Sequence, residues 1–175
     1  PRAESIYNQI LEADPNQPQA LHLLGVIAHQ GGHNEQAVEL IEKSLAIKPD
    51  YVDAHSNLGN ALRVLGRPEE AKAHFHKVLT LKPDYAEAHY NLGLLLEKKE
   101  LFEEAVSSYQ RAVSLKTDFT MAHNKLGLAL AEMGQLEEAV AVYNQALSVN
   151  PDLEEVLSNL GVALAQMGRQ DDAIA

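Results

Sequence analysis

Five glycines recur along this chain at a constant interval of 34 residues. They are Gly25, Gly59, Gly93, Gly127 and Gly161. Five alanines keep the same interval, and they are Ala37, Ala71, Ala105, Ala139 and Ala173. A fixed period of this length indicates a stacked array of helix pairs, in which each unit contacts only its neighbours. This regularity predicts binding rather than catalysis.

The period divides the chain of 175 residues into repeats with no linker between them. Complete repeats are expected at 18–51, 52–85, 86–119 and 120–153. Residues 1–17 resemble the second helix of an earlier repeat, and 154–175 the first part of a later one. Because the sequence begins in mid-pattern, we interpret it as a piece of a longer protein that carries a single array.

Each repeat is expected to contain two helices. In the second repeat the first helix is predicted over 54–65, where Leu58, Ala61 and Leu62 follow helical spacing. It should stop at Gly66, since helices commonly end on a left-handed glycine. The second helix should begin near Pro68 and end before Pro83. The predicted fold is therefore all-α, a right-handed α-solenoid of tandem antiparallel helix pairs.

The periodic glycines need a physical reason, because a glycine inside a helix costs roughly 1 kcal/mol against alanine. We interpret Gly59 as lying against Ala71, which would let the two helices of a pair approach closely. Glu100 stands where other repeats have the terminal glycine. A left-handed Glu100 would cost on the order of 1–2 kcal/mol.

Composition narrows the function further. The formal net charge of −11 argues against nucleic acid, which is bound by lysine and arginine, and against anionic membranes. No apolar run approaches the ~20 residues that a membrane span needs. Cysteine is absent, which fits a reducing compartment, and we expect the cytoplasm.

Nothing in the sequence predicts catalysis, a metal or a cofactor. There is no cysteine nucleophile and no glycine-rich phosphate loop, and acidic pairs such as Glu69 and Glu70 begin helices, where they suit the macrodipole. His55, His89 and His123 lie one repeat apart. Neighbours ~10 Å apart cannot share an ion whose nitrogen ligands lie at ~2 Å. We therefore expect these histidines to pack.

The pattern of small, large and turn residues resembles the tetratricopeptide repeat (TPR) family along the whole chain. In the second repeat its signature residues are Leu58, Gly59, Leu62, Gly66, Ala71, Phe75, Leu79 and Pro83. The strings at 53–59 and 87–93 also resemble the repeats that precede the catalytic region of O-linked N-acetylglucosamine transferases, and the strings at 20–25 and 28–32 resemble bacterial members of that group. That resemblance implies a substrate-recognition region, although no catalytic domain is present.

The TPR resemblance implies that the first helix of each repeat lines a concave groove that binds proteins or extended peptides. Asn57, Asn91 and Asn159 recur at one register, interrupted by Lys125. Asn amides pair with peptide groups, and repeats ~10 Å apart would meet about every third residue of an extended strand. Alternatively, these asparagines solvate the groove or bond to the neighbouring helix. The predicted groove residues are Asn57, Asn60, Arg63, Tyr90, Asn91, Asn124, Lys125 and Asn159.

Other uses of the array stay open. A carboxylate clamp for acidic chaperone tails is disfavoured, because Ser56 and Met121 occupy positions where the family requires lysine. A stand-alone adaptor without an enzyme is the main alternative to a transferase-associated module. Self-association is a further expectation, because the last helix stops at 172–175 and leaves apolar surface open.

Overall fold

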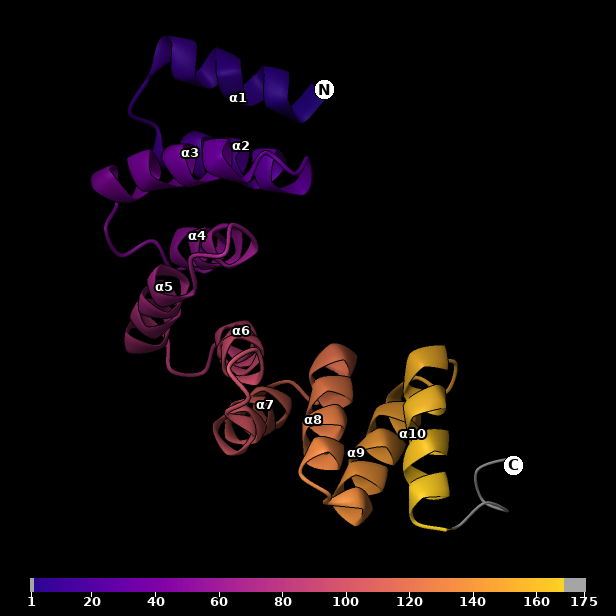
Figure 1. Ribbon diagram of the computed structural model, residues 1–175. Coiled ribbons are helices and arrows are strands. Elements are labelled where there is room, and N and C mark those ends of the chain that lie inside the picture. Colours follow the sequence, from indigo (N-terminus) through magenta and orange to yellow (C-terminus); the bar gives the residue numbers. More distant parts are fainter. Residues whose placement is uncertain (1, 169–175) are drawn as a thin grey trace. The chain divides into compact units, whose positions relative to one another are not determined.

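The computed structural model describes residues 2–168, which form ten helices and no strands (Figure 1). The chain divides into two compact units at Pro83 and Asp84. The all-α prediction is confirmed. Ala173 and the chain end at 172–175, on which the expectation of an open apolar end rests, lie outside the described residues.

The first unit contains five helices. They are α1 (Arg2–Ala13), α2 (Pro18–Gln30), α3 (Asn34–Ile47), α4 (Val52–Val64) and α5 (Pro68–Leu81). Helix α1 packs against α2, and α2–α3 and α4–α5 are helix pairs joined by short turns. The hydroxyl of Ser44, near the end of α3, donates to the carbonyl of Pro18, at the start of α2, over 2.7 Å. That contact brings the end of one helix to the start of the other, so the pair is antiparallel.

The second unit repeats the same arrangement. Its helices are α6 (Ala86–Glu97), α7 (Phe102–Leu115), α8 (Thr120–Glu132), α9 (Leu136–Val149) and α10 (Glu154–Gln166). The pairs are α6–α7 and α8–α9, and α10 packs on α9. Tyr109, Leu126 and Tyr143 lie in the core of this unit, each at most 3% exposed.

The turn inside each pair has one conformation. Gly66 has φ +72°, its N–H bonds to Arg63, and the N–H of Arg67 bonds to the carbonyl of Leu62 at 2.9 Å. These two bonds satisfy the last carbonyls of α4, as helix C-termini require. Glu100 adopts the same conformation at φ 59°. The predicted left-handed residues are thus confirmed at both positions.

The periodic glycines do make room, but for a different side chain than expected. A Cβ on Gly59 would lie 2.6 Å from Cε1 of Phe75, and one on Gly25 would lie 2.5 Å from Cγ1 of Ile41. Gly93 and Gly127 likewise face Tyr109 and Tyr143. The atoms nearest to a Cβ on Gly59 belong to Phe75 rather than to Ala71, whereas Ala37, the repeat equivalent of Ala71, does lie close to Gly25, with its carbonyl oxygen 3.1 Å from the added Cβ. Each glycine accommodates the large side chain that comes sixteen positions later in the sequence.

Candidate functional site

The first helices of the repeats are α2, α4, α6, α8 and α10, and they carry the predicted site residues. In the first unit Asn57 donates from Nδ2 to Nε2 of His22 at 2.8 Å. Because that nitrogen accepts, Nδ1 of His22 carries the proton and donates to the hydroxyl of Tyr51 at 3.1 Å. Burial lowers the pKa of His22, and nearby Asp53 partly opposes this shift. The imidazole is thus held neutral between two helices.

The second unit contains a matching bond. Asn159 in α10 donates from Nδ2 to Oδ1 of Asn124 in α8 at 2.8 Å. Both Asn57 and Asn159 therefore bond to the first helix of the preceding repeat, as the alternative interpretation of the row expected. Each still keeps its amide oxygen and a second N–H for another partner. Asn91, the third member of the row, is only 6% exposed.

Lys125, which interrupts the row, is tied to the repeat before it. Its Nζ lies 2.9 Å from Oε1 of Glu97, and the other oxygen of Glu97 accepts from the hydroxyl of Tyr109 at 2.6 Å. The Lys125 and Glu97 side chains are 32% and 27% exposed. The positive charge of Lys125 is therefore compensated inside the protein.

One pocket of about 570 Å³ gathers three of the predicted residues, Tyr90, Asn124 and Lys125. We call it the α8–α10 pocket. Its lining residues are Tyr90, Thr120, Met121, Asn124, Lys125, Asp152, Leu153, Glu154, Glu155 and Val156. This volume falls within the ~300–1,000 Å³ typical of ligand sites. Asn159 lines a separate, smaller pocket of about 200 Å³.

The acidic side of the pocket was missed in the predicted site. Asp152, Glu154 and Glu155 come from the turn before α10 and its first residues. A signal was present in the sequence, because Asp53, Glu87 and Glu155 share one repeat position at which the fourth repeat has Met121. Met121, which interrupts this series of acidic residues, lies in the pocket.

The remaining predicted residues lie on α4, in the first unit. Asn57, Asn60 and Arg63 are all half-buried. Nε of Arg63 is buried and has no hydrogen-bond partner in the described part of the chain. The guanidinium head of this side chain therefore carries donors that the fold does not use fully.

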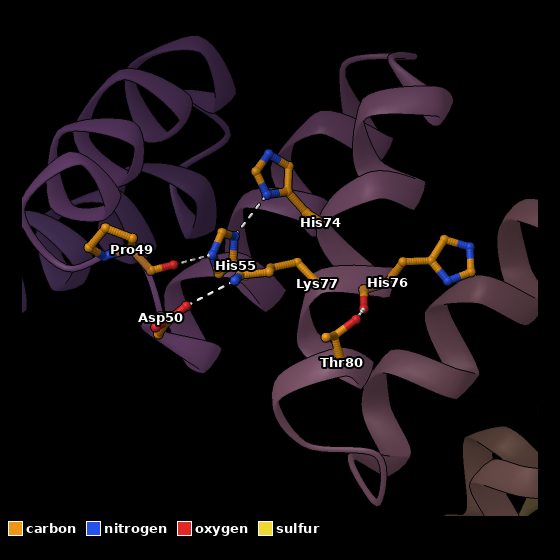
Figure 2. Close-up of polar contacts among 7 residues, drawn as sticks. All are labelled: Pro49, Asp50, His55, His74, His76, Lys77 and Thr80. Atoms are coloured by element: carbon orange, nitrogen blue, oxygen red, sulfur yellow. Dashed lines mark hydrogen bonds and ion pairs between the residues drawn. The ribbon is translucent and has the colours of Figure 1, made fainter.

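The histidines do pack, with contacts that repeat spacing did not predict. Figure 2 shows His55 between the Pro49 carbonyl, 2.8 Å from its Nε2, and His74 of α5, whose Nδ1 lies 2.9 Å from its own Nδ1. Asp50 pairs with Lys77 beside them at 2.9 Å (Figure 2). Burial, and then the charge of His55, lower the pKa of His74. Aligning the antiparallel helices α4 and α5 about the turn that joins them would have placed positions 55 and 74 opposite each other.

His123 repeats the carbonyl contact in the second unit, because its Nε2 donates to Thr117 at 3.0 Å. Among residues 2–168, no three His, Cys, Asp or Glu side chains converge as metal ligands. Nor, within that range, does any helix have the length and apolar character needed to cross a membrane.

Comparison with known proteins identifies the class. A family model described as TPR repeat matches residues 25–66 and 129–168, and one described as Tetratricopeptide repeat matches 56–118. Together these matches span well over half of the chain. The chain belongs to the tetratricopeptide repeat family. It is a TPR scaffold, a class that mediates protein–protein interactions.

Solved structures agree with that assignment. YrrB, described as "a TPR protein with an unusual peptide-binding site", is 25% identical with a TM-score of 0.76, over 96% of this chain and 87% of its own. MamA is 28% identical with a TM-score of 0.78, over 86% of this chain and 88% of its own. PilF of Pseudomonas aeruginosa, 24% identical, shares the fold with a TM-score of 0.82, over 90% and 72%. Among curated proteins, none is similar enough in sequence to count as a relative.

Proposed function

We propose that this scaffold holds an extended segment of a partner protein on the first helices of its repeats, with the α8–α10 pocket as the main site in the second unit. The observation that carries this proposal is the convergence of Tyr90, Asn124 and Lys125 on one pocket of about 570 Å³. The peptide-binding site named for YrrB supports the same use of a TPR surface.

The amide row contributes weaker contacts in this proposal. Asn91 and Asn159 lie on the same set of helices as the pocket, and each net hydrogen bond contributes ~0.5–1.5 kcal/mol. Asn57, Asn60 and Arg63 have the corresponding role in the first unit. Because the asparagine amides bind the main chain of the partner, we expect this row of asparagines to accept segments of different sequence.

The setting of the scaffold is a separate part of the proposal. The resemblance of 53–59 and 87–93 to transferase repeats suggests substrate recognition for an attached enzyme. A stand-alone adaptor is favoured by the structures of YrrB and MamA, because 87% and 88% of those chains are covered by this array. Sequencing the gene beyond position 175 separates the two, since a nucleotide-sugar-binding domain would support the enzyme.

Self-association is a second candidate function. Sedimentation at rising concentration tests it, and a monomer at the highest concentration would exclude it.

The cytoplasm is our proposed location, since cysteine is absent. Cell fractionation with an antibody to the protein tests this assignment.

Peptide selection tests the main proposal. A display library of random dodecapeptides is panned against the protein, and enriched peptides are titrated by calorimetry. Met121→Trp should weaken binding at least about tenfold, because Met121 is 60% exposed in the pocket. Val149→Trp is the matched control, at 49% exposure on α9. Failure to enrich any peptide, or equal affinity in both variants, would contradict the proposal.

A further inference from the structure

The α8–α10 pocket combines two kinds of surface. Tyr90, Met121, Leu153 and Val156 supply apolar area, while Asp152, Glu154 and Glu155 supply carboxylates on the α10 side. Val156 is 3% exposed and belongs to the core, whereas Met121 is 60% exposed. An apolar floor beside an acidic rim suits a side chain that is itself apolar along its stem and charged at its end.

The charges around the pocket are not balanced. Lys125 is paired with Glu97 at 2.9 Å, and Glu87 of the preceding repeat is paired with Lys116 at 3.1 Å. By contrast, the three rim carboxylates form no ion pair with any described residue. The rim therefore keeps a net negative charge that a cationic partner would neutralise.

The helix macrodipole accounts for only part of that charge. Glu154 and Glu155 lie in the first turn of α10, where the positive end of a helix is equivalent to about half an elementary charge. Three carboxylates exceed that compensation several-fold. The rim carboxylates therefore carry more negative charge than the positive end of α10 compensates.

Asn124 adds a directed polar group to the same pocket. Its side chain is 6% exposed and its Oδ1 accepts from Asn159. Its Nδ2 group makes no hydrogen bond to the rest of the described chain, although the residue lines the pocket. Because this nitrogen is not itself among the buried atoms that lack a partner, it is open to a group outside the described chain. A carbonyl of a bound main chain would supply one.

We propose that the α8–α10 pocket binds an arginine or lysine side chain of an extended partner segment. The aliphatic stem lies over Met121 and Leu153, the cationic head lies among the rim carboxylates, and Asn124 donates to a neighbouring carbonyl of the segment. Met121 is suited to this role because a flexible thioether adapts to different stems. This inference rests on the proposed peptide-binding function and specifies the chemistry of its partner.

The test uses five pools of fluorescein-labelled octapeptides, random except for a fixed central residue: arginine, lysine, citrulline, norleucine or glutamate. Binding to the whole protein is measured by fluorescence anisotropy. The arginine and lysine pools should bind at least about tenfold more tightly than citrulline and norleucine, with glutamate weakest, because hydrogen bonds between charged groups are the strong ones. Raising the salt concentration should reduce the difference, since it screens exposed charges.

Charge-neutral variants locate the effect. Asp152→Asn combined with Glu155→Gln should remove the preference for basic pools, whereas Glu137→Gln, at the start of α9, should preserve it. Equal affinity of all five pools for the native protein would overturn this inference. If the five pools bind the native protein equally but bind Met121→Trp more weakly, the proposed peptide-binding function stands without this inference. If no pool binds at all, the proposed function and this inference both fail.

Discussion

Tyr109 donates its hydroxyl to Oε2 of Glu97 over 2.6 Å, and so fixes the carboxylate that also holds Lys125. The tyrosine ring is fully buried, and it lies against Gly93 of the paired helix. A single carboxylate therefore joins the core of one repeat to the surface of the next.

Removing that hydroxyl should destabilise the second unit. Tyr109→Phe is expected to lower the free energy of unfolding by about 1.5–3 kcal/mol, the usual contribution of a hydrogen bond to a charged group. Tyr143→Phe is the matched control, because the Tyr143 hydroxyl has no hydrogen-bond partner within residues 2–168. Urea denaturation followed by circular dichroism measures both, and equal losses would contradict the role given to Glu97.

Alanine should not be tolerated at Gly59. A new Cβ would lie 2.6 Å from Cε1 of Phe75, which is itself fully buried. We expect Gly59→Ala to cost about 1–3 kcal/mol through overpacking. Gly31→Ala is the control, since its Cβ would meet no atom closer than 3.4 Å. A thermal unfolding scan should show a lower midpoint for Gly59→Ala alone.

Glu100 stores strain that a glycine would relieve. Its φ of 59° costs on the order of 1–2 kcal/mol for a residue with a side chain. The extra freedom of glycine in the unfolded chain offsets about 0.4–1 kcal/mol of that gain. Glu100→Gly should therefore stabilise the protein by up to about 1.6 kcal/mol, and Gly134→Glu should destabilise the same unit. A loss of stability in Glu100→Gly would show that the turn is not strained.

The protein should lose stability in mild acid. The pKa values of His22 and His74 are lowered, mainly by burial, so the unfolded chain binds protons before the folded one does. Their contribution is fully present above the ordinary histidine pKa of about 6.5 and is lost as pH falls through the lower folded values. Exposed Asp50 and Glu70 titrate below this window, because their pKa values are lowered from already acidic ones.

Two variants test whether these histidines cause the loss of stability in mild acid. His22→Gln and His74→Gln should each flatten the fall in stability between pH 7 and 5, because each removes a histidine whose pKa is lowered in the folded protein. Denaturation midpoints at several pH values measure the slope. An unaltered slope in His74→Gln would contradict the assignment.

The helices and turns could be predicted because they depend on local chemistry. Gly66, Pro68 and Pro83 mark ends of helices through backbone geometry alone, and the structure confirms them as limits of α4 and α5. Even Glu100 follows, since the period places it at a left-handed position. Because the repeat length is fixed, the same positions end the helices in every repeat.

Side-chain partners were harder to predict. The period aligns Gly59 with other glycines, but not with the residue that fills the space opposite, and the recurring large residue sixteen positions on was overlooked. Whether Asn159 bonds to Asn124 or to a ligand depends on rotamers of two neighbouring helices. The pocket depends on how the turn at 151–153 approaches α8, which repeat spacing does not determine.

The large residues opposite the glycines differ in their optical properties. Ile41 and Phe75 fill the spaces of the first unit, while Tyr109 and Tyr143 fill those of the second. The chain has no tryptophan, and burial raises the pKa of Tyr143 to about 12. The difference in near-ultraviolet dichroism between the native protein and Tyr143→Phe therefore gives an intrinsic optical signal for the interior of the second unit that needs no label.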